Sequence, residues 1–201
     1  MDKNDEKVLV VKSEKLFEKG IWQGLKQDNL EYYLDLINKN FEFKRRGDVE
    51  EDNNYQQIIP YILFSYEGKF FAYKYLSGAG EKRLVNNNYQ LGVGGHINKE
   101  DVADERNIIE AGMMREWNEE VEFAGSLLSK KLVGIINDDS SPVEKVHLGL
   151  VFHFIGDASD INVKETDKME GKIFELKEIE NNLSHSPWMK IVYNDYLKNL
   201  V

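Results

Sequence analysis

Apolar residues follow two different patterns of spacing in the first fifty positions. Residues 7–17 are rich in valine and leucine and predict a first strand. Over residues 28–40 the apolar positions recur at helical spacing instead, at Leu30, Tyr33, Leu34 and Ile37. We therefore expect residues 1–50 to form a strand and helix extension that packs on the main fold.

Strand patterns dominate from Tyr55 onward. Residues 58–66 and 69–76 are aromatic and β-branched and flank Glu67-Gly68, which predicts a β-hairpin. A further strand is expected over residues 89–97, where it ends in glycines. The aromatic-rich hairpin also offers a surface on which a homodimer could form.

An acidic helix is expected over residues 104–122, with Asp101 or Asp104 as its N-cap. Its apolar residues recur every four positions and predict a stripe that packs on a sheet. The stripe consists of Ile109, Met113, Trp117 and Val121.

Strands are expected again over residues 130–138, 143–156, 161–169 and 171–176, and Ser186-Pro187 predicts the start of a last helix. His147 and His153 would share one strand face, where a structural role is favoured. The order of elements predicts an α/β fold with a mixed sheet flanked by helices, its main domain covering residues 51–201.

Composition narrows the function classes. The 201 residues are 41% hydrophobic, contain no cysteine and carry a net charge of −10. No apolar run reaches the roughly 18 residues of a membrane span, so we expect a cytoplasmic protein without a membrane partner. The negative charge argues against binding to a nucleic acid duplex, and an acidic protein that handles phosphates would need a bound cation.

Carboxylates crowd on the expected acidic helix. Glu116 and Glu120 project together beside the apolar stripe, and Glu119 lies on the same flank, where Arg115 can pair with it. A solvated helix surface is one interpretation. The other is a site for a hard ion, Mg²⁺ or Mn²⁺, because carboxylate oxygens suit such ions.

Glycines before the helix favour the second interpretation. Gly94 and Gly95 end a strand, so their backbone amides could approach a phosphate closely. His96 and Arg83 are further candidates for substrate contact. The basic triplet at residues 44–46 could be either a solvated surface run or a phosphate contact.

At these residues the chain resembles the Nudix hydrolase superfamily. Its signature is Gly, five residues, Glu, seven residues, then Arg-Glu-aliphatic-x-Glu-Glu-x-Gly-aliphatic, and residues 115–120 match the second half with Trp117 in the aliphatic slot. Gly95 precedes Arg115 by 20 positions where the signature has 14, Asn107 stands in place of Glu, and Glu122 in place of Gly. The variant resembles a divergent branch of predicted Nudix-type phosphoesterases, and the resemblance implies a Nudix-like α/β/α sandwich.

The resemblance also implies roles for individual residues. It makes Glu116, Glu119 and Glu120 ligands of Mg²⁺ or Mn²⁺, Arg115 the group that orients them, and either Glu116 or Glu119 the base. A further acid from a distant loop is common in the family, and the candidates here are Glu144, Glu165, Asp167 and Glu170.

The activity implied is a metal-dependent pyrophosphohydrolase or phosphoesterase that cleaves a diphosphate linkage in a small nucleotide derivative. An isomerase of the same fold is disfavoured because the chain lacks the cysteine of that chemistry. The alternative of another class is a Nudix-like domain that senses a nucleotide without cleaving it. Substrate contacts are expected from residues 1–50 and from the loop 77–88.

Overall fold

The structure is a computed structural model that describes residues 2–76, 89–103, 107–182 and 186–200. Arg83, the loop 77–88 and Asp104 lie outside the described residues. The chain divides into two compact units. The first unit falls within residues 1–61, 94–115 and 132–151, and the second within residues 62–93, 116–131 and 152–201.

Four long elements each contribute one end to each unit, namely β4 (Tyr55–Tyr66), α4 (Ile108–Glu120), β7 (Leu127–Asn137) and β8 (His147–Gly156). The other elements of the first unit are η1 (Lys3–Asp5), β1 (Lys7–Lys12), α1 (Ser13–Leu16), β2 (Gly24–Lys26), α2 (Leu30–Asn40), β3 (Glu42–Arg45), α3 (Arg46–Val49), η2 (Lys99–Ala103) and η3 (Glu144–Val146). Those of the second are β5 (Lys69–Tyr75), β6 (Val121–Phe123), β9 (Ile161–Val163), β10 (Met169–Glu175), α5 (Leu176–Asn182), α6 (Pro187–Asp195) and η4 (Leu197–Leu200).

The main sheet has the strand order β10-β5-β4-β8-β7-β2, with β1 paired to both β3 and β4. The predicted α/β class with a mixed sheet and flanking helices is confirmed. Residues 1–50 share the first unit with later segments. A domain boundary near residue 50 therefore stays a prediction.

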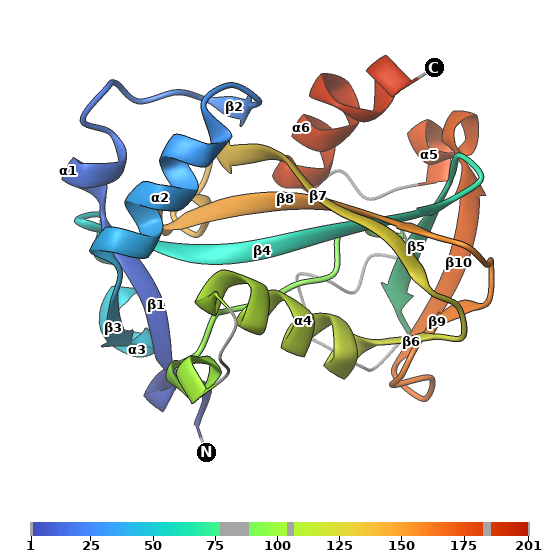
Figure 1. Cartoon of the computed structure of the whole chain (residues 1–201), viewed down its shortest axis with the longest axis horizontal. Coiled ribbons are helices and arrows are strands. Elements are labelled where there is room, and N and C mark those ends of the chain that lie inside the picture. Colours follow the sequence, from blue (N-terminus) through green and yellow to red (C-terminus); the bar gives the residue numbers. More distant parts are fainter. Residues whose placement is uncertain (1, 77–88, 104–106, 183–185, 201) are drawn as a thin grey trace. The chain divides into compact units, whose positions relative to one another are not determined.

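In the first unit, strand β1 is buried between two partners. Leu9 pairs with Phe43 of β3, and Val10 pairs with Gln57 of β4. The strand residues Val8 to Val11 are all fully buried, which explains the unbroken apolar run in the sequence. Helix α2 lies beside β1 (Figure 1) and buries Tyr33 and Ile37, as its periodicity predicted.

The strand expected over residues 7–17 is shorter than predicted. β1 ends at Lys12 and α1 begins at Ser13. The hydroxyl of Ser13 donates to the carbonyl of Asn53 at 2.8 Å, and its backbone N–H donates to Asn54 at 2.8 Å. These hydrogen bonds to a distant loop end the strand at Lys12. Hydrophobic periodicity could not predict them, because they depend on residues about 40 positions away.

In the second unit, the predicted hairpin is present as β4 and β5 (Figure 1). Tyr66 pairs with Lys69 around Glu67 (φ 48°) and Gly68 (φ 75°). Two successive left-handed residues give the two-residue turn whose twist matches the strands. Near the C-terminal end, α6 begins at Pro187 after Ser186, as predicted.

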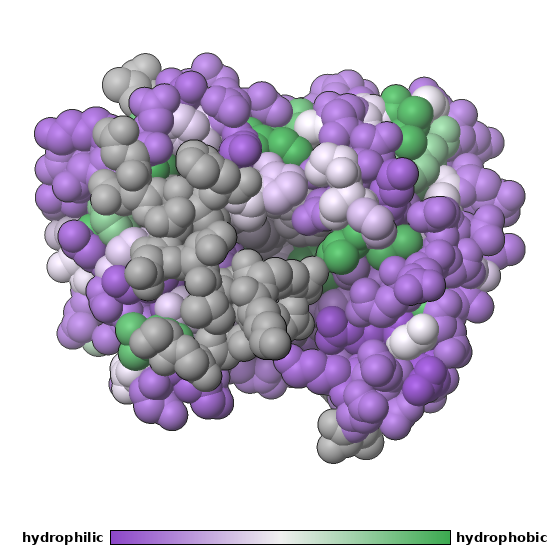
Figure 2. Space-filling view, turned by 180° about the vertical axis from the view of Figure 1, so that it is seen from behind, coloured by the Kyte–Doolittle hydropathy of each residue, from purple (hydrophilic) through white to green (hydrophobic). Residues whose placement is uncertain are grey.

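Apolar side chains are scattered thinly over the surface. The face shown in Figure 2 is mainly hydrophilic with small separate hydrophobic groups. Within the part of the chain that the structure describes, every helix is too short or too polar to cross a membrane.

Candidate functional site

In the first unit, the glycine segment lies tight against the chain at Pro60. A β-carbon at Gly94 would stand 1.8 Å from the carbonyl oxygen of Pro60, so only glycine fits there. Three residues later, the carbonyl of the fully buried Ile97 accepts a hydrogen bond from the N–H of Leu9 at 2.8 Å. The segment therefore lies against β4 at one end and is bonded to β1 at the other. Residues 89–97 form isolated β-bridges and not the continuous strand that was predicted.

His96 makes its contacts inside the first unit. Its Nε2 lies 2.9 Å from Oε1 of Gln57, and its ring meets that of His147 edge to face at 5.5 Å. Burial holds the pKa of His96 well below its usual value, with Arg46 lowering it further. His96 is thus neutral near pH 7, and the predicted substrate contacts of His96, Gly94 and Gly95 stay predictions.

Arg115 ties helix α4 to the glycine segment. Its Nε donates to Asp101 Oδ1 at 2.8 Å and its Nη2 to Asp101 Oδ2 at 3.2 Å, while Nη2 also donates to the carbonyl of His96 at 2.7 Å. Asp101 is buried, and its Oδ2 accepts the N–H of Asn98 at 2.8 Å. A planar guanidinium suits this paired recognition of a carboxylate.

Asp101 is the residue of this link that sequence reasoning placed wrongly. It was one of two predicted N-cap candidates for α4, the other being Asp104, but it lies in η2 and accepts the N–H of Asn98 at the start of that turn. The pairing of Arg115 with Glu119 was expected from their four-residue spacing, and it stays a prediction beside the observed contact with Asp101. Asp101 follows Asn98 by three positions, which is the spacing of a capping box and the one available signal.

Helix α4 starts later than predicted. It runs over Ile108–Glu120 and not over residues 104–122. Oδ1 of Asn107 accepts the N–H of Ile109 at 2.9 Å, so Asn107 caps the helix. At its other end, the chain passes without a loop into β6, which contains Val121 and Glu122.

The apolar stripe of α4 is buried as predicted. Ile109, Met113, Trp117 and Val121 are each at most 4% exposed. In the second unit, the indole of Trp117 stacks on Phe64 with ring centroids 5.8 Å apart and meets Phe154 at 5.2 Å. These contacts fix the rotation of the last turns of α4 and therefore the directions in which its carboxylates point.

The three glutamates beside this stripe differ in their exposure to solvent. Glu116 and Glu120 are half-buried, whereas Glu119 is exposed. The carbonyl of Glu120 accepts the N–H of Lys164 at 2.9 Å, and the ammonium of Lys164 donates to the carbonyl of Asn118. Backbone groups at the end of α4 are thus satisfied by the segment that follows β9.

Two of the four further acid candidates share surroundings with Glu120. Glu165 pairs with Lys168 at 2.7 Å, and the pKa of Lys168 is raised mainly by Glu165 and also by Asp167 and Glu120. Glu165 and Asp167 therefore belong to the same electrostatic neighbourhood as Glu120.

The other two candidates have different neighbours. Glu170 accepts the hydroxyl of Tyr89, which lowers the pKa of Glu170, and Lys74 lies 3.6 Å away. Glu144 lies in the first unit and accepts the hydroxyl of Ser141.

Oxygen donors for a metal ion are present on α4. Carboxylates are the ligands that Mg²⁺ and Mn²⁺ prefer, so the donor chemistry of Glu116, Glu119 and Glu120 fits such an ion. Across residues 2–76, 89–103, 107–182 and 186–200, no group of three His, Asp or Glu side chains has the arrangement of a metal site. The assignment of these glutamates as ligands stays a prediction.

A buried polar chain crosses the second unit. Nε2 of His153 lies 2.8 Å from the hydroxyl of Ser65, and its Nδ1 lies 2.8 Å from the hydroxyl of Tyr196. His153 is 8% exposed, and burial lowers its pKa to about 4. These partners agree with the structural role favoured for His153.

The three cations of the basic triplet, residues 44–46, contact acidic or aromatic side chains of the same unit. Arg45 contacts Asp5 at 2.8 Å and Asp48 at 3.1 Å, and Arg46 contacts Glu50 at 2.8 Å. Lys44 lies over the ring of Tyr55, 4.4 Å from its centroid. Ion pairs and ring contacts therefore account for these cations, and the phosphate interpretation has no support from the geometry.

One protein of known sequence resembles this chain over most of its length. The chain is 32% identical to protein YmaB of Bacillus subtilis (strain 168) over 191 residues, which cover 90% of this chain and 91% of YmaB. No family profile matches it, in agreement with its departures from the Nudix signature.

Solved structures place the fold. A Nudix hydrolase from Nitrosomonas europaea is 17% identical at a TM-score of 0.49, covering 72% of this chain and 90% of that one, too distant to support an argument. The crystal structure of Tm1382, a candidate Nudix hydrolase, is 32% identical, covers 98% of this chain and all (100%) of its own, and has a TM-score of 0.81. On this likeness in sequence and fold, the chain belongs to the Nudix hydrolase superfamily.

Proposed function

We propose that this protein is a metal-dependent hydrolase that cleaves the diphosphate linkage of a nucleoside diphosphate derivative. The observation that carries the proposal is the complete set of Arg115, Glu116, Glu119 and Glu120 on one continuous helix of a Nudix chain. Burial of Trp117 fixes the helix face on which the glutamates lie.

Glu116, Glu119 and Glu120 would hold Mg²⁺ or Mn²⁺. When bound, such an ion neutralises phosphate charge and makes a water molecule more acidic. Glu119 is the most exposed of the three, so a water or substrate can reach its carboxylate directly. Either Glu119 or the half-buried Glu116 would serve as the base that accepts a proton from the attacking water.

Arg115 acts through its neighbours. Its guanidinium holds the carbonyl of His96 and both oxygens of Asp101. This arrangement sets the distance between the glycine segment and the helix backbone, so we assign Arg115 a positioning role.

The proposed substrate is a small nucleotide derivative in the cytoplasm. The net charge of −10 disfavours a nucleic acid duplex, whose affinity comes mainly from lysine and arginine contacts with phosphates.

A panel of nucleoside diphosphate derivatives, incubated with Mg²⁺ or Mn²⁺, tests the proposal. We expect Glu119→Gln and Glu120→Gln to lower kcat/KM at least about a hundredfold, because each removes a negative oxygen donor while keeping the side-chain shape. Glu122→Gln is the matched control, since Glu122 is an exposed acid two positions beyond Glu120. Equal background rates in wild type and all variants would overturn the hydrolase assignment.

A nucleotide sensor is the second candidate, favoured by Asn107. A neutral residue stands where the family signature has glutamate, and it serves as a helix cap. Calorimetry that detects tight binding of a nucleoside diphosphate sugar, with no product after hours, would favour the sensor. Asn107→Asp keeps a capping oxygen and adds a charge, so a gain of turnover in this variant would identify the missing carboxylate as the cause.

A further inference from the structure

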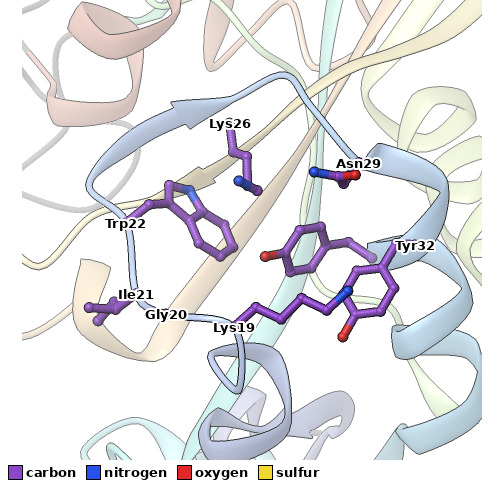
Figure 3. A pocket seen from close by; sticks show the side chains of 8 residues that line it. Lys19, Gly20, Ile21, Trp22, Lys26, Asn29 and Tyr32 are labelled. Atoms are coloured by element: carbon purple, nitrogen blue, oxygen red, sulfur yellow. The ribbon is translucent and has the colours of Figure 1, made fainter.

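A pocket of about 290 Å³ lies in the first unit, between the end of α1 and the start of α2 (Figure 3). It is lined by Lys19, Gly20, Ile21, Trp22, Lys26, Asn29, Tyr32 and Tyr33. The lining residues all belong to the segment 1–50, and the helix α4 contributes none of them. The volume is near the lower end of the range for small-molecule sites, so a ligand of one ring system with a short substituent fits.

Aromatic rings form one wall of the pocket. Trp22 meets Tyr33 edge to face at 5.2 Å, and Tyr33 meets Tyr32 at 5.1 Å. The indole N–H of Trp22 donates to the carbonyl of Ile135 at 3.3 Å, and Tyr33 is only 3% exposed. Tyr33 is therefore anchored in the protein interior, and the half-buried rings of Trp22 and Tyr32 offer the surface on which a planar ring can pack.

Two lysines lie over this wall. The ammonium of Lys19 is 3.5 Å from the centroid of Tyr32, and that of Lys26 lies 5.6 Å from Trp22 and 5.8 Å from Tyr33. Figure 3 shows the side chains of Lys19 and Lys26 reaching toward the same space. Asp28 contacts Lys26 at 2.8 Å and offsets part of its charge, so Lys19 supplies most of the attraction for an anion.

The loop that carries these residues contains three residues with positive φ. Gly20 has φ 105°, Gly24 has φ 92° and Asn29 has φ 55°. Glycine adopts positive φ readily, whereas Asn29 keeps its left-handed conformation only where the surrounding structure favours it. The loop thus keeps a defined shape around the pocket.

We propose that this pocket binds a phosphorylated planar ring of nucleoside monophosphate size. The ring packs against Trp22 and Tyr32, and the phosphate is held by the ammonium groups of Lys19 and Lys26. Aromatic side chains bind planar bases through their faces, and lysine is a common point-charge partner of phosphate. The site is separate from the glutamates of α4 and does not depend on the proposed hydrolase activity.

Calorimetric titration of the full-length protein in EDTA tests the site, with AMP and UMP as probes. We expect at least one of them to bind saturably below 1 mM, on the order of an ordinary metabolite affinity. Adenosine lacks the phosphate and ribose 5-phosphate lacks the ring, so each should bind at least about tenfold more weakly than AMP. Failure of both nucleotides to bind would overturn the proposal.

Variants locate the binding on the protein. Lys19→Ala should weaken nucleotide binding about fivefold to tenfold, and Lys19→Arg should retain it, because an exposed cation is removed or kept. Trp22→Leu should abolish the binding, with circular dichroism as the check of folding. Lys39→Ala is the matched control, since Lys39 is an exposed lysine of α2 outside the pocket.

The glutamate variants separate this site from the proposed catalytic one. Glu119→Gln should bind AMP as wild type does. Binding that is lost in Glu119→Gln and kept in Lys19→Ala would assign the nucleotide to α4 and overturn the pocket. Loss of hydrolysis in Glu119→Gln bears only on the hydrolase proposal.

Discussion

The buried histidine of the second unit gives the stability of the protein a defined pH dependence. His153 is neutral between the hydroxyls of Ser65 and Tyr196, and its pKa falls from 6.5 to about 4 because burial disfavours the charged ring. The unfolded chain keeps a pKa near 6.5 and so takes up a proton first as the pH falls. The contribution of neutral His153 is therefore complete above pH 6.5 and is lost progressively down to about pH 4.

The magnitude follows from the two pKa values. Their difference corresponds to a total of roughly 3 kcal/mol, of which about 2 kcal/mol is lost by pH 5. Because the two titrations overlap, the slope between these limits is at most about 1.2 kcal/mol per pH unit. His96 and His147 also have pKa values lowered by burial, so they add to the wild-type slope with the same sign.

Urea unfolding of wild type and His153→Gln from pH 7.5 to pH 4.5 isolates the effect. Glutamine keeps polar atoms for the neighbouring hydroxyls and cannot be protonated in this range. We expect the free energy of unfolding to fall less steeply in the variant, by about 1.2 kcal/mol per pH unit between pH 6 and pH 4.5. Parallel curves for the two proteins would refute the reasoning, whatever the difference in their absolute stability.

Three further substitutions have expected costs. Gly94→Ala should lower the free energy of unfolding by about 3 kcal/mol or more, because its β-carbon would meet the carbonyl of Pro60. Arg115→Lys should lose the paired contact with Asp101 and cost about 2 kcal/mol by urea unfolding. Asn107→Ala should remove the cap of α4 and cost about 1 kcal/mol in the same assay.

Each of these substitutions has a control in the same chain. Gly68→Ala tests a glycine with open space around it, and it should cost only about 1 kcal/mol through its positive φ. Arg45→Lys changes an exposed arginine and should cost under about 1 kcal/mol. Asn107→Asp should keep the cap. Equal losses in a variant and its control would show that the named contact is not the cause.

The sequence correctly predicted those elements that are determined by residues within a few positions of one another. Glu67-Gly68 between two aromatic runs predicted the hairpin, and the four-residue spacing from Ile109 to Val121 predicted the buried face of α4. Both depend on neighbours within a few positions. The same holds for Ser186-Pro187 at the start of α6.

Contacts between residues far apart in the sequence could not be predicted in this way. Arg115 finds Asp101 only because the chain folds back between them, and His153 lies between partners 88 and 43 positions away. The pocket at Lys19 to Tyr33 likewise needs the turn between α1 and α2 to close. The crowding of the glutamates was predicted from helix geometry alone, and their ligand role awaits the assay.

The direct passage from α4 into β6 restricts where the length of this chain can change. Glu120 ends the helix and Val121 already pairs with Val163, so no residue between them can absorb an insertion. One added residue there would turn Val121 outward and expose the apolar face of the strand. An affinity tag or reporter loop placed between Glu120 and Val121 would therefore disrupt the pairing of β6 with β9 in the second unit.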